Sequence, residues 1–267
     1  MFEYTRLDRL KIPINARVDR ILSPAYVSEM IGTFFLVLTV CLAVFSTESD
    51  ETLKRTLRPL SIGVILMVMI FSTGGISGAH FNPAVTVTLH LTHPDKVPLK
   101  TAVRYIVSQT IGGMLAALLG RWIMSHSATL SPGENRTAFD AMSAEVFFAL
   151  ALCFVVLNVA TTQQDVNNQY YGLAIGFTVA SAAYAIGPVS GCALNPAVSF
   201  SVMMTHFFFT GEGLSYIVVY IGTPMIGAFF ASSLFKLIRK AEFSLVESPY
   251  AQVTSENKPA TASVITN

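Results

Sequence analysis

Six long apolar segments follow one another along the chain, separated by shorter polar connections. They cover residues 26–47, 59–77, 102–124, 141–161, 170–188 and 214–238. Each has roughly the 20 residues that a helix needs to cross the hydrocarbon core of a bilayer. Two further apolar segments, 84–91 and 197–209, are too short to span, and each follows an Asn-Pro pair. The pattern predicts an all-α membrane protein with six transmembrane helices and two shorter helices inside the membrane.

The composition agrees with a membrane location. Hydrophobic residues make up 52% of the 267-residue chain and charged residues only 12%, whereas soluble domains carry about 25% charged residues. The net charge of +1 does not indicate nucleic acid as a partner. Cys41, Cys153 and Cys192 have neither a metal-ligand spacing nor that of a disulfide framework. Because the sequence also holds no catalytic constellation, we expect no metal, no cofactor and no enzymatic activity.

The two halves of the chain repeat each other. GAHFNPAVT at 78–86 returns 113 positions later as GCALNPAVS at 191–199, and Glu29 and Glu145 begin the first span of each half, 116 positions apart. Each half contains three spans, which is an odd number, so the halves must be inverted with respect to the membrane. We expect a channel domain over 24–240, built from repeat one at 24–125 and repeat two at 138–240.

The Asn-Pro pairs predict where the two short helices begin. Asn is a favoured N-cap residue, and Pro is favoured at the first helical position, so Asn82-Pro83 and Asn195-Pro196 each start a helix. Inversion brings these helices in from opposite faces, so that their N-termini meet near the middle of the membrane. Each N-terminus carries roughly half a positive charge. The pair therefore predicts an electrostatic gate that repels cations and turns the oxygen of a passing water toward the centre.

The distribution of Lys and Arg predicts the orientation. Twelve of the 17 Lys and Arg residues fall on the side of the two termini, and cytosolic loops carry the excess of these residues. We therefore expect both termini in the cytosol, with 1–23 as a cytosolic N-terminal segment and 241–267 as a disordered cytosolic tail. Asn135, in an Asn-Arg-Thr glycosylation triplet, then falls on the non-cytosolic side.

These features together resemble the aquaporin, or major intrinsic protein, family over residues 24–240. The resemblance rests on both Asn-Pro-Ala motifs, on the two Glu-led first spans and on QTIGG at 109–113. It implies a right-handed bundle of six transmembrane helices with two re-entrant half-helices, and a homotetramer with one pore in each subunit. It also implies a pore that the two Asn-Pro-Ala motifs line: Asn82, Pro83, Ala84, Asn195, Pro196 and Ala197.

The resemblance further implies a selectivity filter on the non-cytosolic side of the motifs. Its positions are Ile62, Ala183, Cys192 and Val198. Val198 stands where the family usually has Arg, and Ala183 replaces the His of many strict water channels, so we expect an apolar and wider filter. A Val at this place resembles one group of plant tonoplast aquaporins. Cys192 matches the cysteine of mercury-sensitive members, although a small packing residue is the alternative.

Three buried polar residues have two interpretations each. As ionisable groups inside spans, Glu29 and Glu145 would indicate ion or proton coupling. The resemblance instead implies that they accept hydrogen bonds from the irregular backbone before each half-helix. His80 either lines the pore as a gating group that senses pH or is a hydrogen-bonded structural histidine.

We therefore predict a passive transmembrane water channel in a lipid bilayer, which also passes small neutral solutes. One alternative is a broad channel for glycerol, ammonia or hydrogen peroxide. Another is a secondary transporter built from inverted repeats, and a third is an adhesion protein with a closed pore. The sequence leaves open whether the channel lies in the plasma membrane or in an intracellular vacuole-type membrane.

Overall fold

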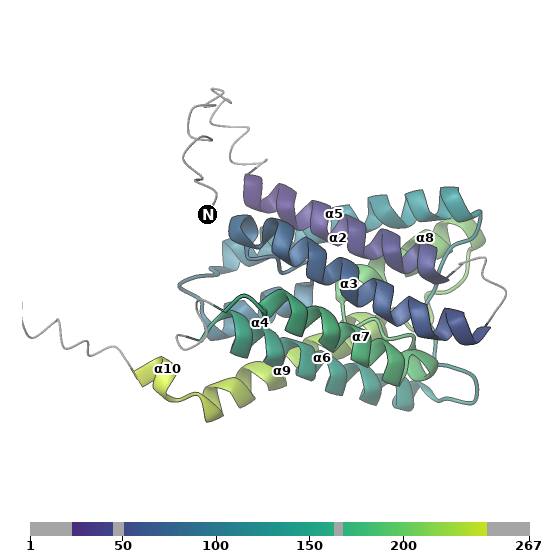
Figure 1. Cartoon of the computed structure of the whole chain (residues 1–267). Helices are drawn as coiled ribbons and strands as arrows, with labels where there is room; N and C mark the ends of the chain where they lie inside the picture. Colours follow the sequence, from purple (N-terminus) through teal and green to yellow (C-terminus); the bar gives the residue numbers. More distant parts are fainter. Residues whose placement is uncertain (1–22, 45–50, 163–167, 245–267) are drawn as a thin grey trace, which may run out of the picture.

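The computed structural model describes residues 23–44, 51–162 and 168–244, and these residues form helices joined by turns (Figure 1). The helices are α2 (Pro24–Val44), α3 (Glu51–Ser77), α4 (Pro83–Thr92), α5 (Leu99–Met124), α6 (Ala138–Ala160), α7 (Tyr171–Ser190), α8 (Pro196–Thr210), α9 (Ile217–Ile238) and α10 (Ala241–Ser244). We call the side on which the described chain begins and ends the terminal side, and the opposite side the distal side. They lie at the left and right of Figure 1.

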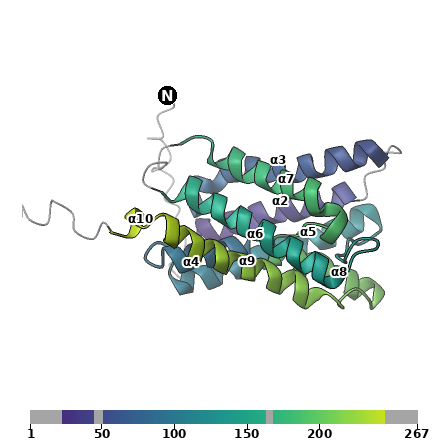
Figure 2. The same cartoon turned by 90° about the horizontal axis from the view of Figure 1, so that it is seen from below.

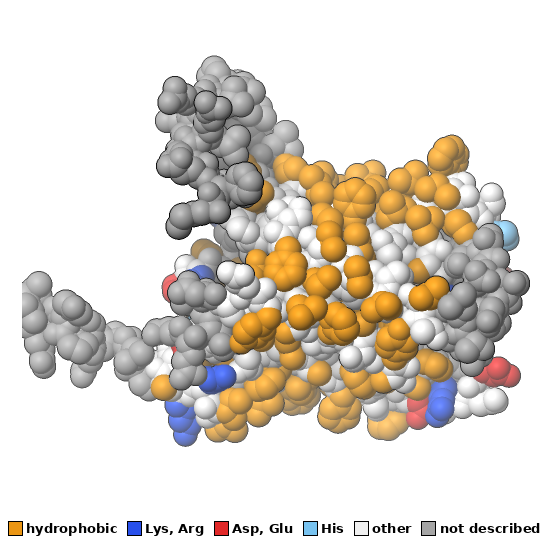
Figure 3. All heavy atoms as spheres, in the orientation of Figure 1, with side chains coloured by type: hydrophobic (Ala, Val, Ile, Leu, Met, Phe, Trp, Pro, Cys, Tyr) orange, Lys and Arg blue, Asp and Glu red, His pale blue; other side chains and the backbone are white. Residues whose placement is uncertain are grey.

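Six of these helices are long and apolar enough to cross a membrane. They are α2, α3, α5, α6, α7 and α9, which confirms the six predicted spans. The surface of the bundle carries large apolar side chains such as Val218, Trp122 and Phe139, each more than 70% exposed. Figure 3 shows hydrophobic side chains covering the middle of one face, with charged residues gathered at its two ends. Such a surface suits lipid, because lipid chains solvate apolar side chains and leave charges at the interfaces.

The predicted span boundaries agree with the helices within three residues, except at the start of α3. The apolar run begins at Pro59, but the helix begins eight residues earlier, at Glu51. Hydropathy marks the part of a helix that lies in lipid, whereas the helix itself ends where its backbone hydrogen bonds end. Arg58 belongs to this polar extension, and its Nε donates to the carbonyl oxygen of Ala43 at 2.8 Å.

The same helix crossing is built twice, once in each half. A Cβ on Gly112 of α5 would lie 2.2 Å from the carbonyl oxygen of Met30 in α2. A Cβ on Gly227 of α9 would lie 2.6 Å from the carbonyl oxygen of Val146 in α6. Glycine is needed at both places because the two backbones touch. These contacts pack α2 against α5 and α6 against α9, which are the first and last spans of each repeat.

The two halves meet where α3 crosses α7. A Cβ on Gly63 would lie 2.5 Å from the carbonyl oxygen of Gly176, and a Cβ on Gly176 would lie 2.5 Å from that of Gly63. This reciprocal contact joins positions 113 apart in the sequence, which is also the spacing of the Asn-Pro-Ala copies. The crossing therefore lies on the axis that relates the two repeats.

The half-helices α4 and α8 lie inside the bundle, in its terminal and distal halves respectively, as both views show (Figures 1 and 2). They contain 10 and 15 residues, so they are about 15 Å and about 22 Å long. Neither can cross a hydrocarbon core of about 30 Å. Both stay in the bundle, and their N-termini face each other.

The polar tail predicted from residue 241 differs from the structure at its start. Residues 241–244 form α10, and the ring of Phe243 lies 6.0 Å from the rings of both His93 and Phe235. These aromatic contacts give the short helix a partner, which composition alone does not reveal. The rest of the tail and the N-terminal segment up to residue 22 lie outside the described residues.

Candidate functional site

The two Asn-Pro pairs cap the half-helices. Asn82 is extended, with φ −154° and ψ 121°, and its Oδ1 accepts from the backbone N of Ala84 at 2.8 Å. Asn195 is extended in the same way, and its Oδ1 accepts from Ala197 N at 3.0 Å and from Val198 N at 3.4 Å. Because each side-chain oxygen serves its own helix, the NH₂ group of each amide is left to face away from the helix.

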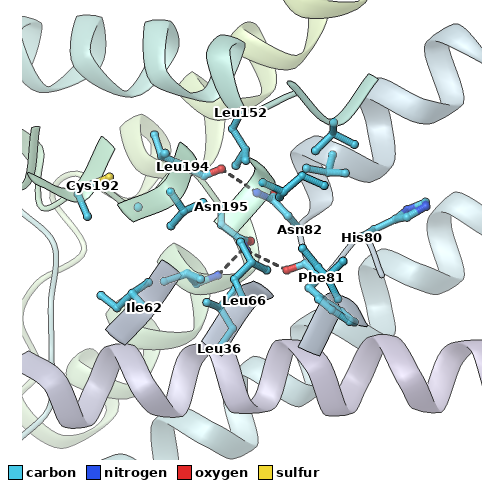
Figure 4. A pocket seen from close by; sticks show the side chains of 18 of the residues that line it. Leu36, Ile62, Leu66, His80, Phe81, Asn82, Leu152, Cys192, Leu194 and Asn195 are labelled. Atoms are coloured by element: carbon cyan, nitrogen blue, oxygen red, sulfur yellow. Dashed lines mark hydrogen bonds between the residues drawn. The ribbon is translucent and has the colours of Figure 1, made fainter. Parts of the chain in front are cut away.

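Each amide then reaches across to the other repeat. Asn82 Nδ2 donates to the carbonyl oxygen of Leu194 at 2.9 Å, and Asn195 Nδ2 donates to that of Phe81 at 2.9 Å. Figure 4 marks both of these bonds with dashed lines in the wall of the cavity. An amide carries two N–H groups, so one on each side chain holds the half-helices together while the other can donate to a molecule in the centre.

The turns before the half-helices have an unusual backbone. Ala79 and Phe81 have φ of 51° and 49°, and their equivalents in the second repeat, Cys192 and Leu194, have φ of 54° and 50°. Non-glycine residues rarely occupy this left-handed region, and each such residue costs about 1–3 kcal/mol. Surrounding contacts must therefore hold both turns in place.

Glu29 provides those contacts in the first repeat. Its Oε1 accepts from Ser77 Oγ at 2.7 Å and from His80 N at 3.0 Å. Its Oε2 accepts from Phe81 N and from Gln109 Nε2, both at 2.8 Å. The side chain is fully buried, and all four partners are donors, which matches the hydrogen-bonding capacity of an ionised carboxylate.

Glu145 repeats the arrangement in the second half. Its Oε1 accepts from Ser190 Oγ at 2.6 Å and from Ala193 N at 2.9 Å, and its Oε2 accepts from Leu194 N at 2.7 Å. It is also fully buried. Both carboxyl groups are thus occupied by the turns that precede the half-helices.

One cavity runs the length of the molecule between the repeats. It has a volume of about 1520 Å³, and both Asn82 and Asn195 line it. At its terminal end it is bounded by His93 and Lys96, and at its distal end by Glu134 and Arg136. Between these ends most of the lining is aliphatic. The polar groups of the two capped turns therefore lie at the middle of a path whose walls are otherwise apolar.

The family model described as "Major intrinsic protein" matches residues 18–235 of this sequence. The chain belongs to the major intrinsic protein family. Members of this family are channels rather than enzymes, and the inverted repeats with two capped half-helices are in accord with that. The family prediction drawn from the two motifs is thus confirmed, and so is the predicted fold class.

The relatives of this major intrinsic protein include several from plants. The probable aquaporin NIP-type of Nicotiana alata is 31% identical, covering 83% of this chain and 80% of that protein. Aquaporin NIP1-2 of Arabidopsis thaliana is 33% identical, with 82% and 76% covered, and nodulin-26 of Glycine max is 30% identical, with 83% and 80% covered. These three are not tonoplast aquaporins, so they do not support the predicted tonoplast-like filter.

A solved structure has the same fold. The aquaglyceroporin from Plasmodium falciparum superposes with a TM-score of 0.73, covering 82% of this chain and 98% of that chain at 20% identity. At this identity the likeness concerns the fold alone.

The four positions predicted to form a filter in this major intrinsic protein all line the cavity, on the distal side of the two Asn. They come from four elements: α3, α7, the turn before α8, and α8 itself. Cys192 is half-buried, and Figure 4 shows it on the side of Asn195 that faces away from His80. Val198 is 5% exposed. The structure thus brings the four predicted positions together around the cavity.

His80 shows features of both of its interpretations. Its Nδ1 lies 3.1 Å from Thr86 Oγ1, its ring lies 4.9 Å from that of Tyr105, and it is 7% exposed. It also lines the cavity on the terminal side. A hydrogen bond and a ring contact therefore hold the imidazole in place at the cavity wall.

The remaining predictions fall outside the cavity centre or concern absences. Asn135 lies on an exposed turn between α5 and α6, with φ 57°. Among residues 23–44, 51–162 and 168–244, no group of three or more His, Cys, Asp or Glu side chains could hold a metal ion.

Sequence reasoning missed the charged residues at the cavity ends and the lining residues Leu36 and Leu152. These last two lie 116 positions apart, as Glu29 and Glu145 do, so the repeat register was the signal that could have found them.

Proposed function

We propose that this protein is a passive channel for water that also passes small neutral solutes. The observation that carries the proposal is the position of Asn82 and Asn195 at the middle of the continuous cavity, where two half-helix N-termini meet. A water in this place would accept hydrogen bonds from the free amide N–H groups. Its own hydrogens would then point outward, which interrupts a chain of waters along which protons could pass.

Charge exclusion rests on the half-helices. Two N-termini, each with roughly half a positive charge, face one point in a cavity of low dielectric, and they repel cations. The family's usual filter Arg is replaced here by Val198, so the filter adds no fixed charge. We therefore assign cation exclusion to the helix ends and the two amides. Neutral molecules meet no comparable barrier.

A broad solute channel is the second candidate function, and the apolar filter favours it. Ile62, Ala183, Cys192 and Val198 offer a passing molecule no charged or strongly polar side chain. An apolar wall can pack against the carbon atoms of glycerol, whose removal from water is favourable. The secondary transporter is less well supported, because Glu29 and Glu145 already accept from three or four donors each.

The assembly and its orientation belong to the same proposal. We propose a homotetramer in which each subunit has its own pore, with both termini in the cytosol and Asn135 on the opposite face. The membrane is either the plasma membrane or an internal vacuole-type membrane. The likeness of the filter to that of tonoplast aquaporins remains a proposal based on Val198 alone.

Stopped-flow light scattering on proteoliposomes tests the function. Vesicles that hold the purified protein should shrink faster in a sucrose gradient than empty vesicles. Glycerol entry after a glycerol gradient then measures how broad the channel is. No acceleration in either gradient, with protein that is folded by circular dichroism, would refute an open channel. Flux that saturates and needs an ion gradient would favour the transporter.

The three cysteines provide a matched internal test of the path. A mercurial should block water flow in the wild type and in Cys41→Ser and Cys153→Ser, because those two thiols are buried away from the cavity. Cys192→Ser should conduct but escape the block, because Cys192 lines the cavity. Block that persists in Cys192→Ser would place the water path elsewhere.

A further inference from the structure

The cavity wall itself obeys the internal repeat. Gly63 and Gly176 touch at the crossing of α3 and α7, and the two capping Asn have the same separation of 113 positions. Residues of α3 and α7, of the two turns and of the first turns of α4 and α8 can therefore be paired by this separation. Each pair lies on equivalent backbone at equivalent depth, one member on each side of the midplane.

The distal filter accordingly has a counterpart on the terminal side. The residues 113 positions away from Ile62, Ala183, Cys192 and Val198 are, in the same order, Ile175, Ile70, Ala79 and Val85. We call these four the terminal ring. All four also line the cavity. A solute that crosses the protein must pass both rings, one before and one after the two Asn.

The two rings differ in side-chain volume. Two of the four pairs match, since Ile62 corresponds to Ile175 and Val198 to Val85. The large difference is Ile70, which stands where the distal filter has Ala183 and adds three carbon atoms to the wall. The smaller difference runs the other way, because Cys192 has one sulfur more than its counterpart Ala79. On equivalent backbones, the terminal ring is thus the bulkier of the two.

Burial agrees with this comparison. Every member of the terminal ring is buried, with Ile70 3% exposed, Val85 4%, Ile175 7% and Ala79 8%. In the distal filter only Val198 is buried, and the other three side chains are half-buried. A water-sized sphere therefore reaches less of the terminal ring than of the distal filter.

The neighbouring residue adds to the constriction. His80 follows Ala79 and lines the cavity, whereas its counterpart, Ala193, has only a methyl group at the same place. The contact between His80 Nδ1 and Thr86 Oγ1, at 3.1 Å, holds the imidazole in position. The terminal side thus combines more side-chain volume with a polar ring that can exchange hydrogen bonds with a solute.

We propose that the terminal ring, and Ile70 in particular, sets the largest neutral solute that this channel passes. The distal filter, which lacks its usual Arg, is the wider of the two. The inference rests on the proposed channel function, and it moves size selection from the distal to the terminal side of the two Asn. A polyol such as glycerol then enters the distal half of the cavity more readily than it passes Ile70.

Paired substitutions in the full-length protein test this assignment. Ile70→Ala copies the distal residue Ala183 into the terminal ring, and Ile62→Ala removes the same atoms from the distal filter on the same helix. Val85→Ala and Val198→Ala form a second matched pair on the half-helices, which guards against misfolding of the first pair. The readout is the ratio of glycerol to water permeability in proteoliposomes. Taking a ratio removes differences in the amount of reconstituted protein.

We expect the ratio to rise roughly tenfold in Ile70→Ala, which corresponds to about 1.4 kcal/mol in the permeation barrier. Val85→Ala should also raise it, and each substitution should have a larger effect than its distal partner. An equal or larger rise in Ile62→Ala and Val198→Ala would overturn the inference and return size selection to the distal filter. Failure of the proposed function looks different, because wild-type vesicles would then show no water permeability above empty ones.

Discussion

The buried carboxylate of Glu29 gives the sharpest prediction for stability. Glu29→Gln keeps the size of the side chain but replaces one acceptor oxygen by an NH₂ group. Oε1 faces the backbone N of His80, and Oε2 faces that of Phe81. Whichever way the new amide turns, its NH₂ group meets one of these two N–H groups. One backbone donor of the strained turn is then left without an acceptor.

The structure gives the scale of the loss. A hydrogen bond to a charged group contributes about 1.5–3 kcal/mol, and a buried donor left unpaired costs about 1–3 kcal/mol, two descriptions of overlapping effects. Relief from burying a charge offsets part of this. We therefore expect a net destabilisation of about 1–3 kcal/mol. For a chain of this size that is a fall of about 2–12 °C in melting temperature.

Thermal unfolding of the purified protein in detergent measures this effect. Glu145→Gln should lower the melting temperature by a comparable amount, because Ala193 N and Leu194 N face its two oxygens in the same way. Glu212 is exposed, so Glu212→Gln is the matched control, and exposed substitutions usually change stability by less than about 0.5 kcal/mol. If Glu29→Gln melts within 2 °C of Glu212→Gln, the carboxylate does not hold the turn.

Two further predictions concern helix packing and pH. Gly227→Ala should lower the yield of folded protein on size-exclusion chromatography, because the added Cβ would lie 2.6 Å from the carbonyl oxygen of Val146. Gly222 has open space around it, so Gly222→Ala is the control and should leave the yield unchanged. Equal yields of the two variants would contradict the close crossing of α6 and α9. Burial and the neighbouring Lys96 lower the pKa of His93, with Lys236 adding to this and Asp95 and Glu242 opposing it. The fold therefore favours neutral His93, so the melting temperature should fall as the pH drops below about 6.5, the ordinary His pKa. His93→Gln should weaken that dependence, and an unchanged pH profile would exclude His93 as a contributor.

The sequence by itself determined the features that depend on local chemistry. Spans follow from runs of about 20 apolar residues, because unpaired backbone groups are costly in lipid and helices pair them all. The half-helix starts follow from Asn and Pro, whose capping preferences operate within a few residues. Three spans in each half then require inversion. For this reason both half-helix starts and the six spans agree with the structure within three residues, except at the start of α3.

The tertiary structure decided how residues distant in the sequence meet. That each Asn amide bonds to the turn of the opposite repeat depends on how the halves dock, and so does the close contact of Gly63 with Gly176. Gln109 donates a hydrogen bond to Glu29. Its counterpart in α9, at the 115-residue separation of Gly112 and Gly227, is Pro224, which has no side-chain donor for Glu145. The repeat alone would have suggested equal sites.

The same reason governs the cavity wall. Hydropathy does not distinguish an isoleucine that faces lipid from one that faces the path, because both environments lie next to apolar side chains. The crossing of α3 with α7 places Ile70 in the cavity wall, at the position of the first repeat that corresponds to Ala183 in the second. The sequence alone determined that there are two half-helices and where they begin. Packing of the two repeats decided which side chains surround the path between them, since that depends on long-range contacts with no local signature.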